Sequence, residues 1–133
     1  MKAIIVCGGR AYTDLARVYI ALSVERPDHV ISGGASAWIK MPGSTEKVRV
    51  GADLFAEQWA NERAVGLDVV HANCIKYGPS AGPRRNQQML DMLLRRAGDG
   101  YDIAVIAFPG GRGTADMVRR ARAADVQVIE VLP

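Results

Sequence analysis

Cysteine, histidine and aromatic residues are all scarce in this chain of 133 residues. The chain has two cysteines and two histidines, and Phe, Trp and Tyr make up 6% of it. Cys7 and Cys74 lie far apart without a Cys-x-x-Cys motif, and only His29 and His71 could join them as ligands. This pattern excludes a disulfide framework and a zinc site of the usual spacing, so no metal is predicted. A reducing, cytoplasmic location is expected.

Long apolar runs and a strong charge of one sign are also missing. The N-terminal run from Ala3 to Cys7 is far too short for a signal peptide or a membrane span, so no contact with a membrane is expected. Seventeen Lys and Arg residues stand against fourteen Asp and Glu residues, which leaves a net charge of +3. The basic residues are spread over several segments and form no long tract. This balance permits an anionic ligand without requiring nucleic acid.

What the chain does have is a series of short apolar runs, each bounded by turn residues. Runs that are apolar at consecutive positions predict buried strands, and segments with apolar residues at helical spacing lie between them. The predicted strands are Lys2 to Cys7, His29 to Ser32, Leu67 to His71, Asp102 to Phe108 and Val126 to Val131; the predicted helices are Asp14 to Val24, Ala52 to Ala64, Asn86 to Arg96 and Ala115 to Ala124. Alternation of strands and helices predicts one Rossmann-like three-layer α/β domain over residues 1–133, with about five parallel strands.

One segment, Ser36 to Val50, is too long for the loop that connects a strand to a helix, which normally needs about 2–6 residues. Ala37 to Met41 and Glu46 to Val50 flank a Pro-Gly-Ser-Thr turn, and the second of these alternates as a hairpin strand should. We therefore predict an inserted, projecting β-hairpin. Its apolar and basic side chains suggest a lid over a ligand or a surface for a partner. These side chains are Trp38, Ile39, Met41 and Val48, with Lys40, Lys47 and Arg49.

Glycine-rich motifs follow three of the predicted strands. They are Gly8-Gly9-Arg10, Gly33-Gly34-Ala35 and Pro109-Gly110-Gly111-Arg112-Gly113-Thr114. Because the carboxyl ends of parallel strands meet at one edge of the sheet, these motifs are expected to converge there. Glycine lets the backbone approach a ligand closely, and the start of the next helix offers free N–H groups to a phosphate. One such motif is usually only a tight turn; together they predict a phosphate-binding pocket.

Polar residues near the predicted helix starts add candidates for this pocket. Arg85, just before the third predicted helix, and Asn86, at its start, could contact a phosphate or the edge of a base. Thr114 could donate a hydrogen bond to the ligand or cap its helix. Asp53 and Asp116 fall in first helical turns, where the helix dipole alone can explain a carboxylate. A role in the pocket is the alternative for both.

These motifs, together with Gly51-Ala52-Asp53 and the segment from Ala81 to Asn86, resemble the SLOG superfamily of Rossmann-like proteins that bind nucleotide-derived ligands. The resemblance spans the chain from the first predicted strand to the last and is greatest to the YspA-like branch of bacterial and phage proteins. In that branch the Gly-Gly-Ala and Gly-Ala-Asp motifs are continuous, so the segment from Ser36 to Val50 is an insertion in this chain. The resemblance also implies a homodimer or a higher homo-oligomer.

More distant members of the superfamily are the Lonely Guy phosphoribohydrolases, which cleave the N-glycosidic bond of nucleoside monophosphates. Their signature, PGGxGTxxE, ends in a catalytic glutamate, and the match places Met117 at that position. Asp116 lies one residue earlier and would point about 100° around the helix from it. The arginine that these enzymes carry before the third helix corresponds to Arg85. The resemblance therefore implies phosphate binding more directly than catalysis.

Three functional hypotheses remain open on the sequence. The first is a module that binds or senses a nucleotide or a nucleotide-derived molecule. The second is a hydrolase of the N-glycosidic bond, in which Asp116 or Asp53 would stabilise positive charge on the ribose. The third is DNA binding, which occurs in the DNA-processing protein A of the same superfamily; the modest net charge and few aromatic residues argue against it. No cofactor is predicted.

Overall fold

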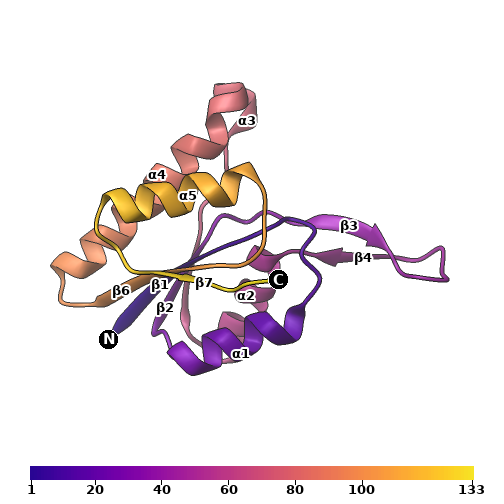
Figure 1. Cartoon of the computed structure of the whole chain (residues 1–133), viewed down its shortest axis with the longest axis horizontal. Coiled ribbons are helices and arrows are strands. Elements are labelled where there is room, and N and C mark those ends of the chain that lie inside the picture. Colours follow the sequence, from indigo (N-terminus) through magenta and orange to yellow (C-terminus); the bar gives the residue numbers. More distant parts are fainter.

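The computed structural model describes residues 1–133 and contains a parallel sheet of five strands (Figure 1). The strand order is β5-β2-β1-β6-β7. The strands are β1 (Lys2–Cys7), β2 (His29–Ser32), β5 (Gly66–Val69), β6 (Asp102–Ala107) and β7 (Val128–Glu130). All of their pairings are parallel, which confirms the predicted Rossmann-like α/β class.

Helices cover both faces of this sheet. Figure 1 shows α1 (Leu15–Glu25) and α2 (Ala52–Glu62) on one side, and α4 (Ala81–Gly98) and α5 (Arg112–Ala123) on the other. Each pair packs on its own face, because parallel strands are joined by crossover helices that return over the sheet. No helix combines the length and the hydrophobicity that a membrane span requires.

The central strand β1 is apolar at consecutive positions because its side chains alternate between two buried faces. Ile4 and Val6 belong to the core that α1 and α2 cover, whereas Ile5 and Cys7 belong to the core that α4 and α5 cover. All four side chains are buried. Burial on both faces is the reason why the sequence of this strand shows no alternation of apolar and polar residues.

The start of α4 differs from the prediction. The helix begins at Ala81, well before the predicted Asn86, so Arg85 lies within its first turns and not in a preceding loop. Pro83 led the prediction to begin the helix too late. It occupies the third helical position, where a missing N–H breaks no hydrogen bond within the helix.

Other elements were also misplaced or missed in the prediction. The helix α5 begins at Arg112, so Gly113 and Thr114 belong to its first turn rather than to a loop. The short helix α3 (Cys74–Tyr77) and the 3-10 helix η1 (Gly78–Ser80) were not predicted. Both are too short to show the apolar periodicity on which helix prediction depends.

The predicted hairpin is present and consists of β3 (Ala37–Lys40) and β4 (Lys47–Val50), which pair antiparallel and form a separate sheet. It projects away from the body of the protein (Figure 1). Ile39 lies opposite Val48, and both pack against the core beneath α1 and α2. The hairpin is therefore anchored to the protein by one of its two faces.

The loop after β1 packs too closely against its neighbours for any side chain to fit at Gly8. A Cβ atom there would lie 2.6 Å from the Cβ of Ala52 and 2.9 Å from the Cβ of Phe108. We expect Gly8→Ala to lower the free energy of unfolding by about 1–3 kcal/mol, because neither neighbour can move without disturbing the core. Urea unfolding followed by circular dichroism measures this loss. Gly98→Ala is the control, since a Cβ at Gly98 meets nothing; equal losses in both variants would contradict the steric explanation.

Candidate functional site

The loops at the carboxyl edge of the sheet contact one another through their backbones. The N–H of Gly9 donates to the carbonyl of Pro109 at 2.9 Å, and the N–H of Ala52 donates to the carbonyl of Gly9 at 3.2 Å. A Cβ at Gly110 would lie 2.8 Å from the nitrogen of Gly9. Close backbone packing thus explains the glycine at position 110 without any ligand.

A cleft of about 570 Å³ opens at this edge, between the first loop, the start of α2 and the starts of α4 and α5. Most of the residues predicted to bind a ligand line it together: Gly8, Gly9, Arg10, Gly33, Ala35, Asp53, Arg85, Asn86, Gly111, Gly113 and Thr114. Arg112, Ala11 and Met89 also line the cleft and were not singled out from the sequence. Arg112 could have been, because it lies inside the glycine-rich motif at the start of α5.

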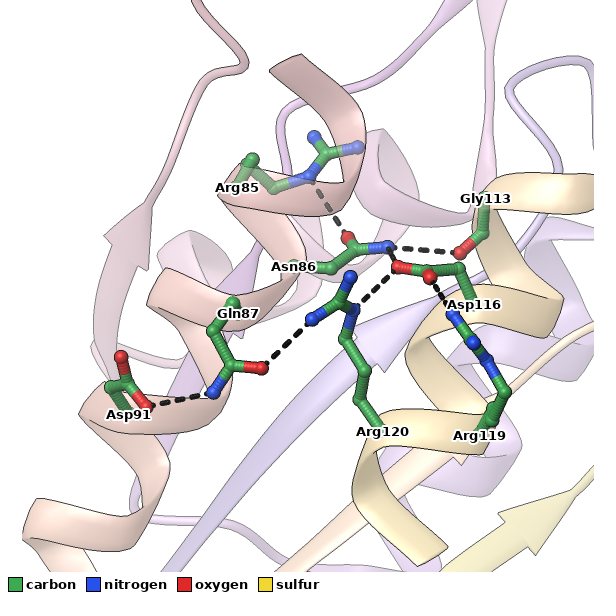
Figure 2. A network of polar contacts seen from close by, with 8 residues as sticks. All are labelled: Arg85, Asn86, Gln87, Asp91, Gly113, Asp116, Arg119 and Arg120. Carbon is green, nitrogen blue, oxygen red and sulfur yellow. Dashed lines mark hydrogen bonds and ion pairs between the residues drawn. The ribbon is translucent and has the colours of Figure 1, made fainter. Parts of the chain in front are cut away.

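Four predicted residues lie outside the lining of this cleft. Gly34 faces His71, whose ring would meet a Cβ at 2.5 Å. Pro109 and Gly110 line a different groove, which runs along α5 toward the C-terminal residues. Asp116 points toward α4 (Figure 2). The structure therefore gathers the first-loop glycines, the α5 start and Arg85 in one place, but not the whole of each motif.

The first turn of α5 presents unused hydrogen-bond donors to the cleft. Gly111 is the N-cap residue, and no side chain caps the helix, so Thr114 is not the cap. The N–H groups of Arg112, Gly113 and Thr114 have no acceptor within the chain. A Cβ at Gly111 or Gly113 would meet no atom within 4 Å. Unlike Gly8 and Gly110, these two glycines have no explanation in packing.

The guanidinium of Arg85 is held at the end of β2. Its Nη1 donates to the carbonyl of Gly33 at 2.6 Å, and its Nε donates to the Oδ1 of Asn86 at 3.1 Å. A Cβ at Gly33 would lie 2.5 Å from this Nη1, so the glycine makes room for the arginine. A fixed guanidinium in the wall of a cleft is a typical partner for a phosphate or carboxylate.

The buried amide of Asn86 joins α4 to α5 (Figure 2). Its Nδ2 donates to the carbonyl of Gly113 and to the Oδ2 of Asp116, both at 3.0 Å. The Nε of Arg120 donates to the same carboxylate at 2.8 Å, and Arg119 forms an ion pair with it. All polar atoms of the Asn86 side chain are therefore satisfied inside the protein, and they fix the position of the α5 start relative to α4.

Asp116 is consequently a structural residue of this interface. Partial burial raises the pKa of its carboxyl group, but hydrogen bonds from Arg120, Asn86 and Arg119 outweigh burial and leave the pKa below its ordinary value. The neighbouring Met117 is fully buried in the core beneath α5. Neither residue presents a free carboxylate to the cleft.

Asp53 is different, because it lies buried in the wall of the cleft with one oxygen unused. Its Oδ2 accepts a hydrogen bond from the N–H of Ala35 at 3.0 Å, whereas its Oδ1 has no partner. Burial raises the pKa of this carboxyl group to about 7, although the Ala35 bond and the charge of Arg85 act in the opposite direction. The negative charge of Glu57, one helical turn away, adds to the rise. The group therefore changes its charge near neutral pH.

Cys7 also reaches the floor of the cleft. It is buried, and burial raises the pKa of its thiol to about 12, so the thiol stays protonated at neutral pH. Cys7 is therefore a core residue and not a nucleophile, because only a thiolate is a good nucleophile. The structure brings together no group of three or more His, Cys, Asp or Glu side chains that could hold a metal ion.

No protein-family model matches the chain, and no curated protein is similar enough to count as a relative.

The raised pKa of Asp53 predicts a pH dependence of stability. Between about pH 4 and about pH 7 the folded protein binds a proton at this carboxyl that the unfolded chain has lost. Stability therefore falls as the pH rises through this range, by at most about 1.4 kcal/mol per pH unit, and the contribution of Asp53 is constant above it. Asp53→Asn removes this slope while keeping an acceptor for Ala35.

Urea unfolding of both proteins across this pH range measures the difference in slope. Asp99→Asn, at an exposed carboxyl group after α4, is the matched control and should keep the slope of the unmodified protein. If Asp53→Asn keeps that slope as well, Asp53 does not hold a proton in the folded state near neutral pH.

Proposed function

We propose that the cleft binds a phosphate-bearing nucleotide or a nucleotide-derived ligand. The observation that carries this proposal is the start of α5. There, no atom of the chain packs against Gly111 or Gly113, and the neighbouring N–H groups have no acceptor. Glycine inside a helix costs about 1 kcal/mol relative to alanine, and no packing within the chain accounts for Gly113. A ligand that contacts the backbone there does account for it.

The charges around this turn favour an anion. The N-terminal end of a helix carries a partial positive charge, and its free N–H groups point toward a bound phosphate. Arg10, Arg85 and Arg112 line the same cleft, and Asp53 is the one carboxylate among its lining residues. A volume of about 570 Å³ is also that of a pocket for a small organic ligand rather than for a single ion.

The buried Asp53 favours a ligand that offers a hydrogen-bond donor as well as a phosphate. Its Oδ1 lacks a partner, and an unsatisfied buried acceptor destabilises a protein by about 1–3 kcal/mol. A ribose hydroxyl or the amino group of a base would supply the missing donor. A nucleotide carries these groups and a phosphate in one molecule, in agreement with the resemblance of the glycine motifs to nucleotide-binding proteins.

Two glycines in equivalent positions provide a test of this proposal. Gly113 and Gly82 are each the second residue of a helix, and a Cβ would meet nothing at either position, but only Gly113 lines the cleft. We expect either alanine substitution to raise the stability by up to about 1 kcal/mol. Only Gly113→Ala should weaken the binding of adenosine monophosphate and ADP-ribose, by about tenfold or more, because the methyl group blocks the approach to the backbone.

Titration calorimetry gives the affinities, and thermal unfolding gives the stabilities. The proposal fails if the unmodified protein binds no nucleotide, or if Gly113→Ala binds nucleotides as well as Gly82→Ala does.

Hydrolysis of an N-glycosidic bond is the second candidate, and the free Oδ1 of Asp53 is the observation that favours it. In such a reaction the bond between the ribose and the base breaks, and positive charge develops on the ribose ring before water adds to it. An ionised carboxylate beside the ring would stabilise that charge, while Arg85 and the α5 start would hold the phosphate in place. Asp116 cannot do this from its position, because its oxygens are committed to Asn86, Arg119 and Arg120.

The two candidates differ in whether the ligand stays intact. Binding of ADP-ribose, whose phosphate charge is constant near neutral pH, should strengthen several-fold as Asp53 ionises between about pH 6 and about pH 8, because a carboxylate accepts a stronger hydrogen bond from the ligand than the neutral acid does. Base release from a nucleoside monophosphate should rise over this range as well, because it needs the ionised carboxylate. Asp53→Asn should abolish the pH dependence of binding in the first case and the activity in the second.

Calorimetry and chromatography of the free base at several pH values distinguish these outcomes. Stronger binding with intact ligand at high pH supports a binding module, whereas base release that Asp53→Asn retains contradicts the role given to Asp53.

A further inference from the structure

The outer face of the β3-β4 hairpin carries an unusual set of side chains. The strand register places Trp38 opposite Arg49 and Lys40 opposite Lys47. Alternation along each strand puts these four side chains on the same face, and all four residues are exposed. The other face, with Ile39 and Val48, packs against the core beneath α1 and α2. The outer face is therefore turned toward solvent.

The positive charges of this face are not balanced within the chain. Lys40 and Lys47 lie directly opposite each other, and like charges in this position destabilise a pair of strands. None of Lys40, Lys47 and Arg49 forms an ion pair, and the side-chain bond of Arg49 goes to the neutral hydroxyl of Ser36 at 3.0 Å. These three cations are therefore free to contact an anionic partner.

Trp38 adds an aromatic surface to these charges. The residue is 66% exposed, which is rare for tryptophan, and in the strand register it lies opposite Arg49. An exposed aromatic ring among cations is the combination with which proteins bind single-stranded nucleic acid, because the ring stacks on an unpaired base while the cations contact phosphates. We propose that the outer face of the hairpin, formed by Trp38, Lys40, Lys47 and Arg49, binds single-stranded nucleic acid.

An anionic membrane surface is a less suitable partner for this face. Proteins that bind to a bilayer surface insert a continuous apolar face into it. In this hairpin the apolar residues Ile39 and Val48 are turned onto the body of the protein, which leaves one tryptophan among three cations. Stacking on single bases requires no larger apolar surface.

The net charge of the whole chain led us to expect no nucleic-acid binding from the sequence. That expectation averages charge over all residues, whereas the hairpin concentrates three cations and no carboxylate on the outer face of its paired strands. This proposal is independent of the ligand in the cleft, because none of the four residues lines the cleft.

Fluorescence anisotropy with a labelled single-stranded oligothymidine tests the proposal on the full chain. We expect binding that weakens with salt, with a slope of log affinity against log salt of about −2 for three phosphate contacts. Trp38→Ala should weaken binding by about fivefold or more through loss of stacking. Lys40→Gln/Lys47→Gln should weaken it and reduce the salt slope. Arg26→Gln/Arg95→Gln, which removes the same charge from exposed positions elsewhere, should leave the affinity unchanged.

Thermal unfolding verifies that each variant is folded; this is expected because the substituted side chains are exposed. Quenching of the Trp38 fluorescence by the oligonucleotide is a second readout, since the other tryptophan, Trp59, is buried. Gly113→Ala should retain the binding of oligothymidine, which separates this site from the cleft. The proposal is overturned if the unmodified protein does not bind oligothymidine, if it binds duplex DNA or phosphatidylserine vesicles more tightly, or if the hairpin variants bind as well as the control.

Discussion

Burial of both faces of β1 is the constraint on which the rest of the structure depends. Ile4 and Val6 need one layer of helices, and Ile5 and Cys7 need a second, so every neighbouring strand is parallel and reached by a crossover. Crossovers place the turns that leave each strand at the same edge of the sheet. The loop after β1 then lies between the start of α2 and the end of β6, in backbone contact with both. The cleft is a consequence of this arrangement.

Around the cleft, two carboxylates that were both predicted to lie in the first turn of a helix have different roles: Asp53 lines the cleft and Asp116 lies outside its lining. The buried amide of Asn86 has to be satisfied, and it uses the carbonyl of Gly113 and the carboxylate of Asp116. Two arginines occupy the other positions around Asp116. Asp53 has one backbone donor and a buried oxygen without a partner. Asp116 therefore stabilises the junction of α4 and α5, whereas the Oδ1 of Asp53 is free to accept a hydrogen bond from a ligand.

Much of the fold could be predicted because two of its features are visible in short stretches of sequence. Strands buried on both faces are apolar at consecutive positions, and glycines mark the turns that follow them. The five strands, the sheet class and the hairpin were predicted correctly. The starts of α4 and α5 were not, because Pro83 and Gly113 are tolerated in a first helical turn although both usually mark a loop. The different roles of Asp53 and Asp116 could not be predicted either, since they depend on contacts with residues that are distant in the sequence. The sequence also could not tell which glycines are required by packing: close neighbours explain Gly8 and Gly110, but nothing packs against Gly113.

Polar groups without a partner in the chain lie on two walls of the cleft. On one wall are the free N–H groups of Arg112, Gly113 and Thr114, which require an acceptor; on another is the Oδ1 of Asp53, which requires a donor. Water can reach the exposed α5 start but not the buried Oδ1, so solvent satisfies only one of them. Protonation relieves the charge of Asp53 near neutral pH without giving its second oxygen a partner. A ligand with an anionic group at one end and a hydrogen-bond donor at the other satisfies both walls, which inorganic phosphate alone is too small to do.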